Sequence, residues 1–217
     1  MNIVPQKVQR RKSDKRRQSL IDATLAVIAR DGVKAATVRT IAAEANVTQG
    51  LIRYYFQTKD DLITQAYVAF SEQNMQTLQG AQAKGTNAKD RLIICIETAL
   101  SPQLCSPRRI AIWAGFFEIL LHDNALKQSH TKHYQNIRQH IKALITDVLR
   151  EEELNANDAE LRRLSIACTG LLDGTWLEGG AIPKAFHPNE LQRACIEGIG
   201  TLIGVDLKTY YSEHYRK

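Results

Sequence analysis

The segment ANVTQGLIRYYFQTKDDL, residues 45–62, gathers side chains of the kinds that bind nucleic acid. Gln49 and Arg53 can donate hydrogen bonds to base edges, and the two tyrosines after Arg53 can donate to phosphate oxygens. Lys59 follows closely, where an ammonium group at the start of a helix can reach a phosphate. These residue types at this spacing indicate recognition of a polyanion.

The charge distribution agrees with this indication. The net charge of the chain is +6. Residues 1–60 hold 12 Lys/Arg against 5 Asp/Glu, a local charge of +7, and the remainder holds 17 against 18, a local charge of −1. Because the positive charge is confined to the N-terminal part, we expect nucleic acid as the partner, with an anionic membrane surface as the alternative.

Several features predict a cytoplasmic protein that does not enter a membrane. The longest apolar run, IAIWAGFFEILL, has 12 residues and contains Glu118, so it is too short to span a bilayer. No apolar segment of a secretory signal follows the basic N-terminus. The four cysteines are far apart in the sequence, as is typical of free thiols in a reducing compartment.

The elements that must position these side chains are predicted to be helices. Apolar residues recur at the helical period along almost the whole chain, as in the stripe of Leu20, Ile21, Leu25 and Ile28. No stretch alternates for long enough to indicate a sheet, so the predicted class is all-α. We expect about nine helices, over residues 15–31, 37–44, 48–54, 58–82, 88–100, 107–121, 124–152, 157–178 and 188–204.

Two of these helices are short and almost contiguous. Asn46 can take the left-handed conformation that ends the helix begun near Thr37, and Thr48 can cap the next helix. Helices joined by so short a turn cross steeply, which is the geometry of a helix-turn-helix. The first turn of its second helix meets base edges in a major groove. The predicted DNA-contacting residues are Arg39, Thr48, Gln49, Gly50, Arg53, Tyr54, Tyr55 and Lys59.

The segment TVRTIAAEANVTQGLIRYYFQTKDDL resembles the DNA-binding domain of TetR-family transcriptional regulators. The resemblance implies an all-α homodimer that binds double-stranded operator DNA, most often as a repressor, and that is not an enzyme. It also implies a larger C-terminal helical domain that binds a small-molecule effector and dimerises through the helices at 157–178 and 188–204. The implied domains are a flexible basic arm at 1–12, a helix-turn-helix domain at 13–57 and an effector-binding and dimerisation domain at 58–217.

An aromatic group in the C-terminal part could receive the effector. Trp113, Phe116 and Phe117 share one helix face, which is either core or a set of ring faces for a quaternary ammonium. Each ring face stabilises such a cation by up to about 2 kcal/mol when the site is desolvated. Asp173 or Glu118 could supply the counter-charge.

The segments IWAGFFEIL and LLDGTWLEGGA resemble parts of choline-responsive repressors that control betaine synthesis. This resemblance implies choline or a related quaternary amine as the effector, recognised by the residues that match the pattern. The predicted ligand-binding residues are Trp113, Phe116, Phe117, Glu118, Asp173 and Trp176.

Other interpretations remain open on the sequence alone. The chain could be a helical enzyme, a membrane-surface module, or a regulator that responds to a hydrophobic drug or a nucleobase. His130, His133 and His140 share a helix and could bind a metal, but no cysteine or carboxylate completes the set, so we predict neither a metal nor a cofactor. Glycines inside the last two predicted helices, such as Gly170 and Gly174, favour close helix approach across a dimer interface.

Overall fold

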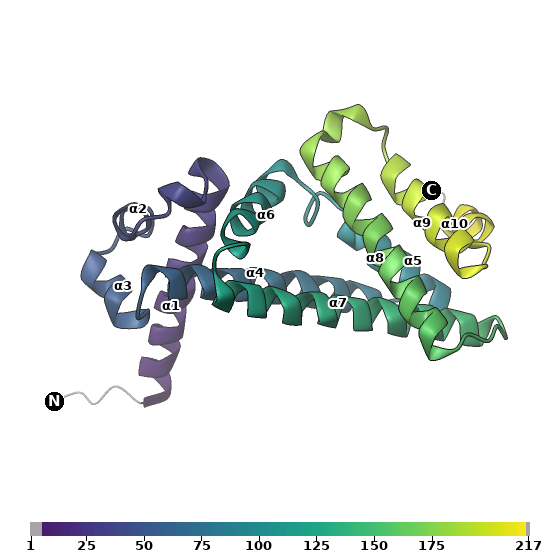
Figure 1. Cartoon of the computed structure of the whole chain (residues 1–217), viewed down its shortest axis with the longest axis horizontal. Coiled ribbons are helices and arrows are strands. Elements are labelled where there is room, and N and C mark those ends of the chain that lie inside the picture. Colours follow the sequence, from purple (N-terminus) through teal and green to yellow (C-terminus); the bar gives the residue numbers. More distant parts are fainter. Residues whose placement is uncertain (1–5, 216–217) are drawn as a thin grey trace. The chain divides into compact units, whose positions relative to one another are not determined.

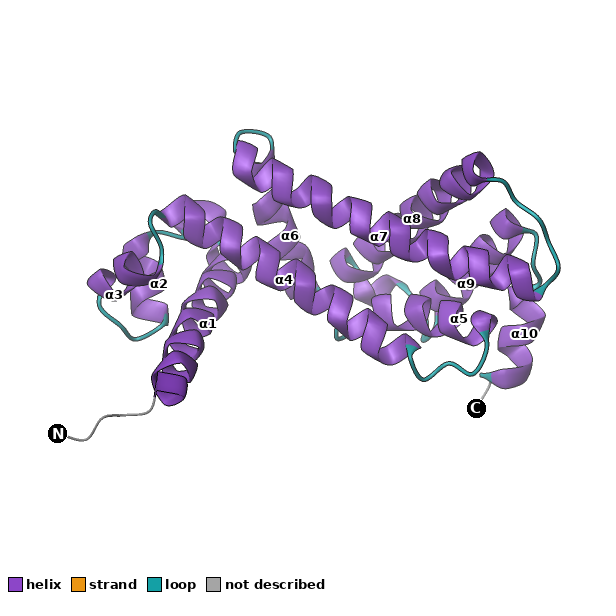
Figure 2. Cartoon of the chain, turned by 90° about the horizontal axis from the view of Figure 1, so that it is seen from below, coloured by secondary structure: helices purple, strands orange, loops and turns teal. Residues whose placement is uncertain are grey.

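The computed structural model describes residues 6–215, with side chains described for residues 13–215. Every regular element in this range is a helix, and Figure 2 shows helices joined by loops without any strand among the described residues. The predicted all-α class is therefore confirmed. The chain divides into two compact units. Unit 1 is the part up to Ser71 together with Ala111–His130, and unit 2 is Glu72–Ile110 together with the part from Thr131 onward. The predicted domain limits stay predictions.

Unit 1 contains the elements expected to bind DNA. Its core is formed by apolar residues from each of its helices, among them Leu20, Ile41, Ile52 and Phe116, all at most 2% exposed. In Figure 1, α2 and α3 lie beside α1. The elements of unit 1 are α1 (Gln6–Asp31), η1 (Val33–Ala35), α2 (Val38–Glu44), α3 (Gln49–Tyr55), the first part of α4 (Lys59–Gln82), α6 (Pro107–Leu120) from Ala111 onward, and the first turns of α7 (Asn124–Glu151).

The first helix begins earlier than the sequence pattern predicts. The apolar stripe predicts a start at residue 15, whereas α1 begins at Gln6, so residues 6–12 of the predicted flexible arm are helical. Residues 1–5 lie outside the described residues. Lys, Arg and Gln are good helix formers, so a helix can continue through a polar segment that shows no apolar period. The apolar stripe marks the buried part of α1 and not its full length.

The turn between α2 and α3 has the geometry that the sequence predicts. Asn46 adopts a left-handed conformation with φ of 52°. The backbone N–H of Val47 then donates to the carbonyl of Ala42 at 2.9 Å, which ends α2. Thr48 stands at the N-cap of α3, but its hydroxyl makes no capping hydrogen bond. A cap on α2 that was not predicted joins Thr37 and Thr40, whose hydroxyls each accept from the backbone N–H of the other.

The start of α4 is capped by a threonine and an aspartate three residues apart, Thr58 and Asp61. The hydroxyl of Thr58 accepts the backbone N–H of Asp61 at 3.0 Å, and the Asp61 carboxylate accepts the backbone N–H of Gln57 at 3.2 Å. The first bond satisfies an N–H group that a helix start leaves without a partner, and the second ties the preceding residue to the first turn of the helix. The direction of α4 as it leaves the helix-turn-helix is therefore fixed locally.

A close contact fixes α6 against α1 inside unit 1. A Cβ atom at Gly115 would lie only 2.7 Å from Cγ2 of Ile28 and 3.5 Å from Cβ of Val33. Gly115 and Ile28 are both buried. The absence of a side chain at Gly115 therefore lets α6 approach α1 and η1 closely.

Unit 2 has its own core, built from residues such as Leu92, Ile145, Val148 and Ile196. Beside the remainder of α4 and α7, it contains α5 (Ala88–Ala99), α8 (Asp158–Ala181), η2 (Pro183–Ala185), α9 (Glu190–Ile203) and α10 (Leu207–His214). The described residues hold ten α-helices, so the predicted number of nine is one too small. The sequence pattern misses α10 because its eight residues bury only Leu207 and Tyr211.

A carboxylate anchors α10 to α5. The phenols of Tyr210 and Tyr215 donate to one oxygen of Asp90 at 2.8 and 3.0 Å, and the hydroxyl of Thr86 donates to the other at 2.6 Å. Burial alone would raise the pKa of Asp90, but these hydrogen bonds prevail and lower it from 3.8 to about 2. A third phenol, that of Tyr211, donates to Glu97 at 2.8 Å.

All four cysteines are buried and free, as the sequence suggests. Burial raises the pKa of Cys95 and of Cys195 to about 12, and that of Cys168 to about 11. Burial also raises the pKa of Cys105. Few of these thiols are therefore ionised near neutral pH.

Candidate nucleic-acid interface and ligand residues

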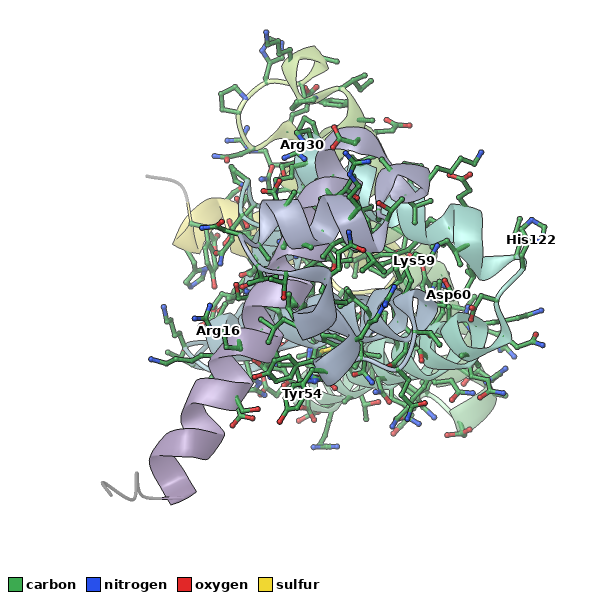
Figure 3. The ribbon with its side chains drawn as sticks, turned by 90° about the vertical axis from the view of Figure 1, so that its left-hand side faces the viewer. Arg16, Arg30, Tyr54, Lys59, Asp60 and His122 are labelled. Atoms are coloured by element: carbon green, nitrogen blue, oxygen red, sulfur yellow. The ribbon has the colours of Figure 1, made fainter. Side chains whose placement is uncertain are left out.

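The exposed side of the helix-turn-helix carries seven of the eight predicted DNA-contacting residues. Arg39 stands on the first turn of α2, Thr48 and Gly50 flank the start of α3, and the side chain of Tyr54 is 79% exposed. Figure 3 labels Tyr54 and Lys59, with Tyr54 lower in the view than Lys59. The exposed residues are Arg39, Thr48, Gln49, Gly50, Arg53, Tyr54 and Lys59.

The opposite side of α3 holds it to unit 1. Ile52 and Phe56 are 2% and 3% exposed and belong to the core. Tyr55 is half-buried against this core, and its ring stands edge-on to that of Tyr54 with centroids 5.1 Å apart. Packing explains the position of Tyr55, so its predicted role in DNA contact stays a prediction.

The basic residues of α1 differ in how they are held. Arg17 donates to Gln65 at 2.9 Å, and its guanidinium lies 5.2 Å from the ring centroid of Phe56, so it braces the base of α3. Lys15 and Arg16 are exposed. Arg30 pairs with Asp31 and with Glu44 of α2 at 2.9 and 2.8 Å. The charges of Lys15 and Arg16 thus face solvent, whereas Arg17 and Arg30 bind to other residues of unit 1.

Four of the predicted ligand-binding residues lie in unit 1, in or beside a cluster of aromatic rings. Phe116 is 1% exposed and Trp113 is half-buried, while Phe117 is 44% exposed. The ring centroids of Trp113 and Phe117 are 5.7 Å apart. Glu118 points to a different partner, since its carboxylate pairs with Lys34 at 2.9 Å. Its charge is therefore already compensated within unit 1.

Residues that the sequence analysis does not assign to the effector complete this ring cluster. Tyr67 and Phe70 of α4 stand edge-on to Trp113, with centroids 5.6 and 5.8 Å away. From α7, the imidazole of His130 lies 5.6 Å from Phe117, 5.9 Å from Tyr67 and 6.3 Å from Trp113, measured between ring centroids. The ring cluster thus comprises Tyr67, Phe70, Trp113, Phe116, Phe117 and His130.

A hydrogen bond fixes the imidazole within the ring cluster. The phenol oxygen of Tyr67 lies 2.8 Å from Nδ1 of His130. Burial raises the pKa of Tyr67 to about 12 and lowers that of His130 below its usual value. Near neutral pH the hydrogen bond therefore joins a protonated phenol to a neutral imidazole.

The remaining two predicted ligand residues lie in unit 2. Asp173 of α8 accepts a hydrogen bond from the phenol of Tyr134 at 3.0 Å. Burial raises the pKa of Asp173, and the Tyr134 hydrogen bond and the charge of Arg138 oppose that rise. The indole N–H of Trp176 donates to the carbonyl of Leu104 at 2.8 Å, so only its ring faces are available to a ligand. The ligand-binding roles of all six residues stay predictions.

One face of α8 and α9 exposes apolar and small residues. Ile166 and Leu177 of α8 are 42% and 54% exposed, and Leu202 of α9 is 43% exposed. A Cβ atom at Gly170 or Gly174 would have no other atom within 4 Å. In Figure 1, α8 and α9 lie side by side in unit 2. These outward residues form what we call the α8/α9 face: Ile166, Gly170, Gly174, Leu177 and Leu202.

Two histidines of α7 are engaged in hydrogen bonds. His140 shares one with Gln82 at 2.8 Å, and His130 shares one with Tyr67. Among residues 13–215, no group of three or more His, Cys, Asp or Glu side chains could hold a metal ion. Within the same described part of the chain, no helix is both long and apolar enough to cross a membrane.

Two family profiles match the chain. "Bacterial regulatory proteins, tetR family" matches residues 20–66, and "BetI-type transcriptional repressor, C-terminal" matches residues 88–204. The HTH-type transcriptional regulator BetI of Vibrio parahaemolyticus is 28% identical over 177 residues, covering 81% of this chain and 85% of that protein.

Solved structures show the same fold. A proposed transcriptional regulator from Pseudomonas aeruginosa superposes with a TM-score of 0.78 at 29% identity, covering 94% of this chain and 95% of its own. A proposed regulator from Saccharomonospora viridis, solved in complex with choline, has a TM-score of 0.67 at 16% identity and covers 93% of this chain and 97% of its own.

Proposed function

This chain belongs to the tetR family of bacterial regulatory proteins and carries a BetI-type C-terminal domain, and from that premise we propose that it is a homodimeric repressor controlled by choline or a related quaternary amine. The family is one of transcriptional regulators and not of enzymes. Three parts of the proposal go beyond the family: the residues that contact DNA, the surface that forms the dimer, and the effector. We place the repressor in the cytoplasm, where operator DNA is found.

The exposed tip of α3 supports the DNA part of the proposal. Gln49 and Arg53 project from the helix while Ile52 and Phe56 hold it from behind. Bidentate contacts from Arg and Gln distinguish bases in the major groove, and Lys59 contacts a phosphate from the start of α4. Arg39, Thr48, Gly50 and Tyr54 are also exposed and would complete the contact surface.

The test is operator binding measured against random DNA. An operator is first selected from genomic fragments, and affinity is then followed by fluorescence anisotropy at two salt concentrations. Alanine at Gln49 should lower affinity for the operator more than affinity for random DNA. Equal losses on both DNAs would show that Gln49 does not read bases.

The α8/α9 face supports the proposed dimer. A second copy of the chain would cover the exposed side chains of Ile166, Leu177 and Leu202, and the open positions Gly170 and Gly174 would allow helices to approach closely. Two copies related by a two-fold axis present two α3 helices. Operator binding requires these helices about 34–36 Å apart, one turn of DNA.

The exposed rings and the buried carboxylate support a cationic effector. In unit 1, Trp113 and Phe117 offer ring faces beside Phe116. In unit 2, Asp173 offers a carboxylate and Trp176 a ring whose N–H is already used. A quaternary ammonium cannot donate hydrogen bonds, so ring faces and a negative charge are the groups that recognise it. The related regulator of Saccharomonospora viridis was solved with choline.

The effector is tested by titrating choline into the protein–operator complex. We expect choline to release the DNA, because an effector shifts a two-state equilibrium only through its different affinities for the two states. The neutral carbon analogue 3,3-dimethylbutanol is the control, since it has the same shape without the charge. Equal release by both compounds would favour a hydrophobic effector, and release by neither would exclude choline.

A further inference from the structure

His130 lies where the ring cluster would hold a cation. Its imidazole centroid is 5.6 Å from the ring of Phe117, 5.9 Å from that of Tyr67 and 6.3 Å from that of Trp113. Attraction between a cation and an aromatic face acts within about 6 Å of the ring centroid. The imidazole therefore lies about as far from each of three rings, one on α4 and two on α6, as a bound cation would.

The imidazole is held there by a hydrogen bond and by contacts with uncharged rings. Its Nδ1 atom shares the hydrogen bond with the phenol oxygen of Tyr67 at 2.8 Å, and burial keeps the ring neutral near pH 7 by lowering its pKa. The negative face of an aromatic ring attracts a full charge more strongly than a neutral ring edge. A quaternary ammonium would gain more from these three rings than the imidazole does.

We propose that His130 is an internal competitor of the effector: its imidazole fills the place among Tyr67, Trp113 and Phe117 that a quaternary ammonium takes, and the cation binds by displacing it. The inference rests on the proposed effector class and adds a residue that sets effector affinity. A site that is open in only a fraction of the molecules has an apparent Kd raised by the inverse of that fraction.

The position of His130 in α7 gives this displacement a mechanical consequence. α7 begins at Asn124, and Asp123 caps it by accepting the backbone N–H of Leu126 at 2.7 Å. His130 is the last residue of unit 1 on this helix, which continues through unit 2 to Glu151. Moving the imidazole therefore acts on a helix that belongs to both units.

The experiment compares His130→Ala with His130→Phe in the full chain. Binding of tetramethylammonium chloride and of choline chloride is measured by calorimetry, and circular dichroism and thermal melting verify the fold of each variant. H130A removes the competitor, so we expect it to bind both cations about tenfold more tightly, as for a site open in roughly a tenth of molecules. H130F keeps the place filled and should show no gain.

Two controls separate the competitor role from other effects. His122→Ala changes an exposed histidine of unit 1, labelled in Figure 3, and should leave cation affinity unchanged. The neutral probe 3,3-dimethylbutanol should bind more weakly than choline to H130A, because it lacks the charge that the rings attract. Equal affinity of H130A for the two probes would mean that the variant only opens an apolar hole, which overturns the proposal.

The remaining outcomes also decide the matter. Weaker or unchanged cation binding in H130A overturns the inference, since the imidazole would then be a direct ligand contact or irrelevant. No binding by either the wild type or H130A also overturns it. If the wild type does not respond to choline on its operator but H130A binds tetramethylammonium tenfold more tightly, the inference stands and choline is excluded as the effector. Operator affinity, measured separately, tests the DNA-binding part of the proposed function.

Discussion

Two pairs of neighbouring helices, α2/α3 in unit 1 and α8/α9 in unit 2, are built alike and expose opposite chemistry. Each pair is held from behind by buried apolar residues, Ile52 and Phe56 for α3 and Cys195 and Ile196 for α9. On the outward side, α3 presents Gln49, Arg53 and Tyr54, whereas α8 and α9 present apolar residues and open glycines. The comparison teaches that the buried residues fix the position of each helix pair, and that the exposed residues determine which kind of partner the pair can bind.

The largest expected effect comes from placing a charge on the α8/α9 face. Leu177→Asp should raise the dimer dissociation constant by about 100-fold or more, because burying an unpaired carboxylate costs several kcal/mol. Analytical ultracentrifugation measures the constant, and operator affinity should fall with it.

Glu178→Gln is the matched control for this change, since Glu178 is exposed on the same helix but is already polar. If the Leu177→Asp protein remains a dimer at low concentration, the α8/α9 face is not the dimer interface. The two helix pairs would then not differ in the way that the comparison assumes.

The second effect concerns the polar pair. Arg53→Ala should weaken operator binding by about 1–3 kcal/mol and leave the melting temperature unchanged, because the side chain is exposed and a lost bidentate base contact costs that much. Lys59→Ala should weaken binding to operator and random DNA alike and reduce the slope of affinity against salt. A loss of fold stability in Arg53→Ala would contradict the assignment of Arg53 to the outward side.

Glycine substitutions sharpen the comparison further. Gly170→Ala should stabilise the isolated chain by about 0.5–1 kcal/mol, because a Cβ there meets no atom within 4 Å and alanine favours a helix. The same change should weaken the dimer if a second copy approaches α8 closely. Gly115→Ala is the opposite case, since its Cβ would lie 2.7 Å from Ile28, and we expect a loss of about 1–2 kcal/mol from overpacking.

Urea unfolding measured at two protein concentrations separates the stability of the chain from that of the dimer. Gly80→Ala serves as the reference, because its Cβ also meets nothing within 4 Å and it lies on α4 and not on the α8/α9 face, so it should stabilise the chain in the same way without changing the dimer constant. An unchanged dimer constant in Gly170→Ala would argue that the two copies do not pack closely at that glycine.

The smallest expected effect is a pH dependence of stability, which we expect for the residues that hold α10 against α9 and not for those that hold α3. α10, which packs on α9, is anchored through Asp90, whose pKa is about 2 in the folded chain against an ordinary 3.8. Because the folded pKa is the lower one, this contribution to stability is present above about pH 4 and is lost as the pH falls towards about 2. Ile52 and Phe56 behind α3 do not titrate.

Hydrogen exchange across this pH range should therefore show α10 loosening before α3. Asp90→Asn should weaken the α10 anchor at pH 7 and remove this part of the pH dependence. If α3 and α10 lose protection from exchange together in the wild type, protonation of Asp90 does not loosen α10 separately from unit 1, and the prediction is wrong.

The parts of the fold that depend on neighbouring residues were predictable from the sequence. The left-handed Asn46 and the cap formed by Thr58 and Asp61 follow from patterns only a few residues long. The start of α6 at Pro107 also follows from one residue, since proline suits the first helical turn. By contrast, α9 begins at Glu190 and not at Pro188, so a proline alone does not fix a helix start.

The ring cluster required information that no local pattern carries. The period of α6 places Trp113 and Phe117 on one face, but it does not indicate that Tyr67 and His130, 63 residues apart, form a hydrogen bond there. The same limit applies to Tyr134, which meets Asp173 across 39 residues. Short helices also escape a period analysis, as α10 shows, because two turns supply too few apolar positions.

The burial of all four thiols makes the chain convenient for distance spectroscopy. With their pKa values raised, Cys95, Cys105, Cys168 and Cys195 should react slowly with maleimides, so a single cysteine introduced at an exposed site can be labelled without removing them. Gln18→Cys on α1 is such a site. In a dimer, the distance between two spin labels at this position would report how far the two copies of unit 1 separate when choline is added.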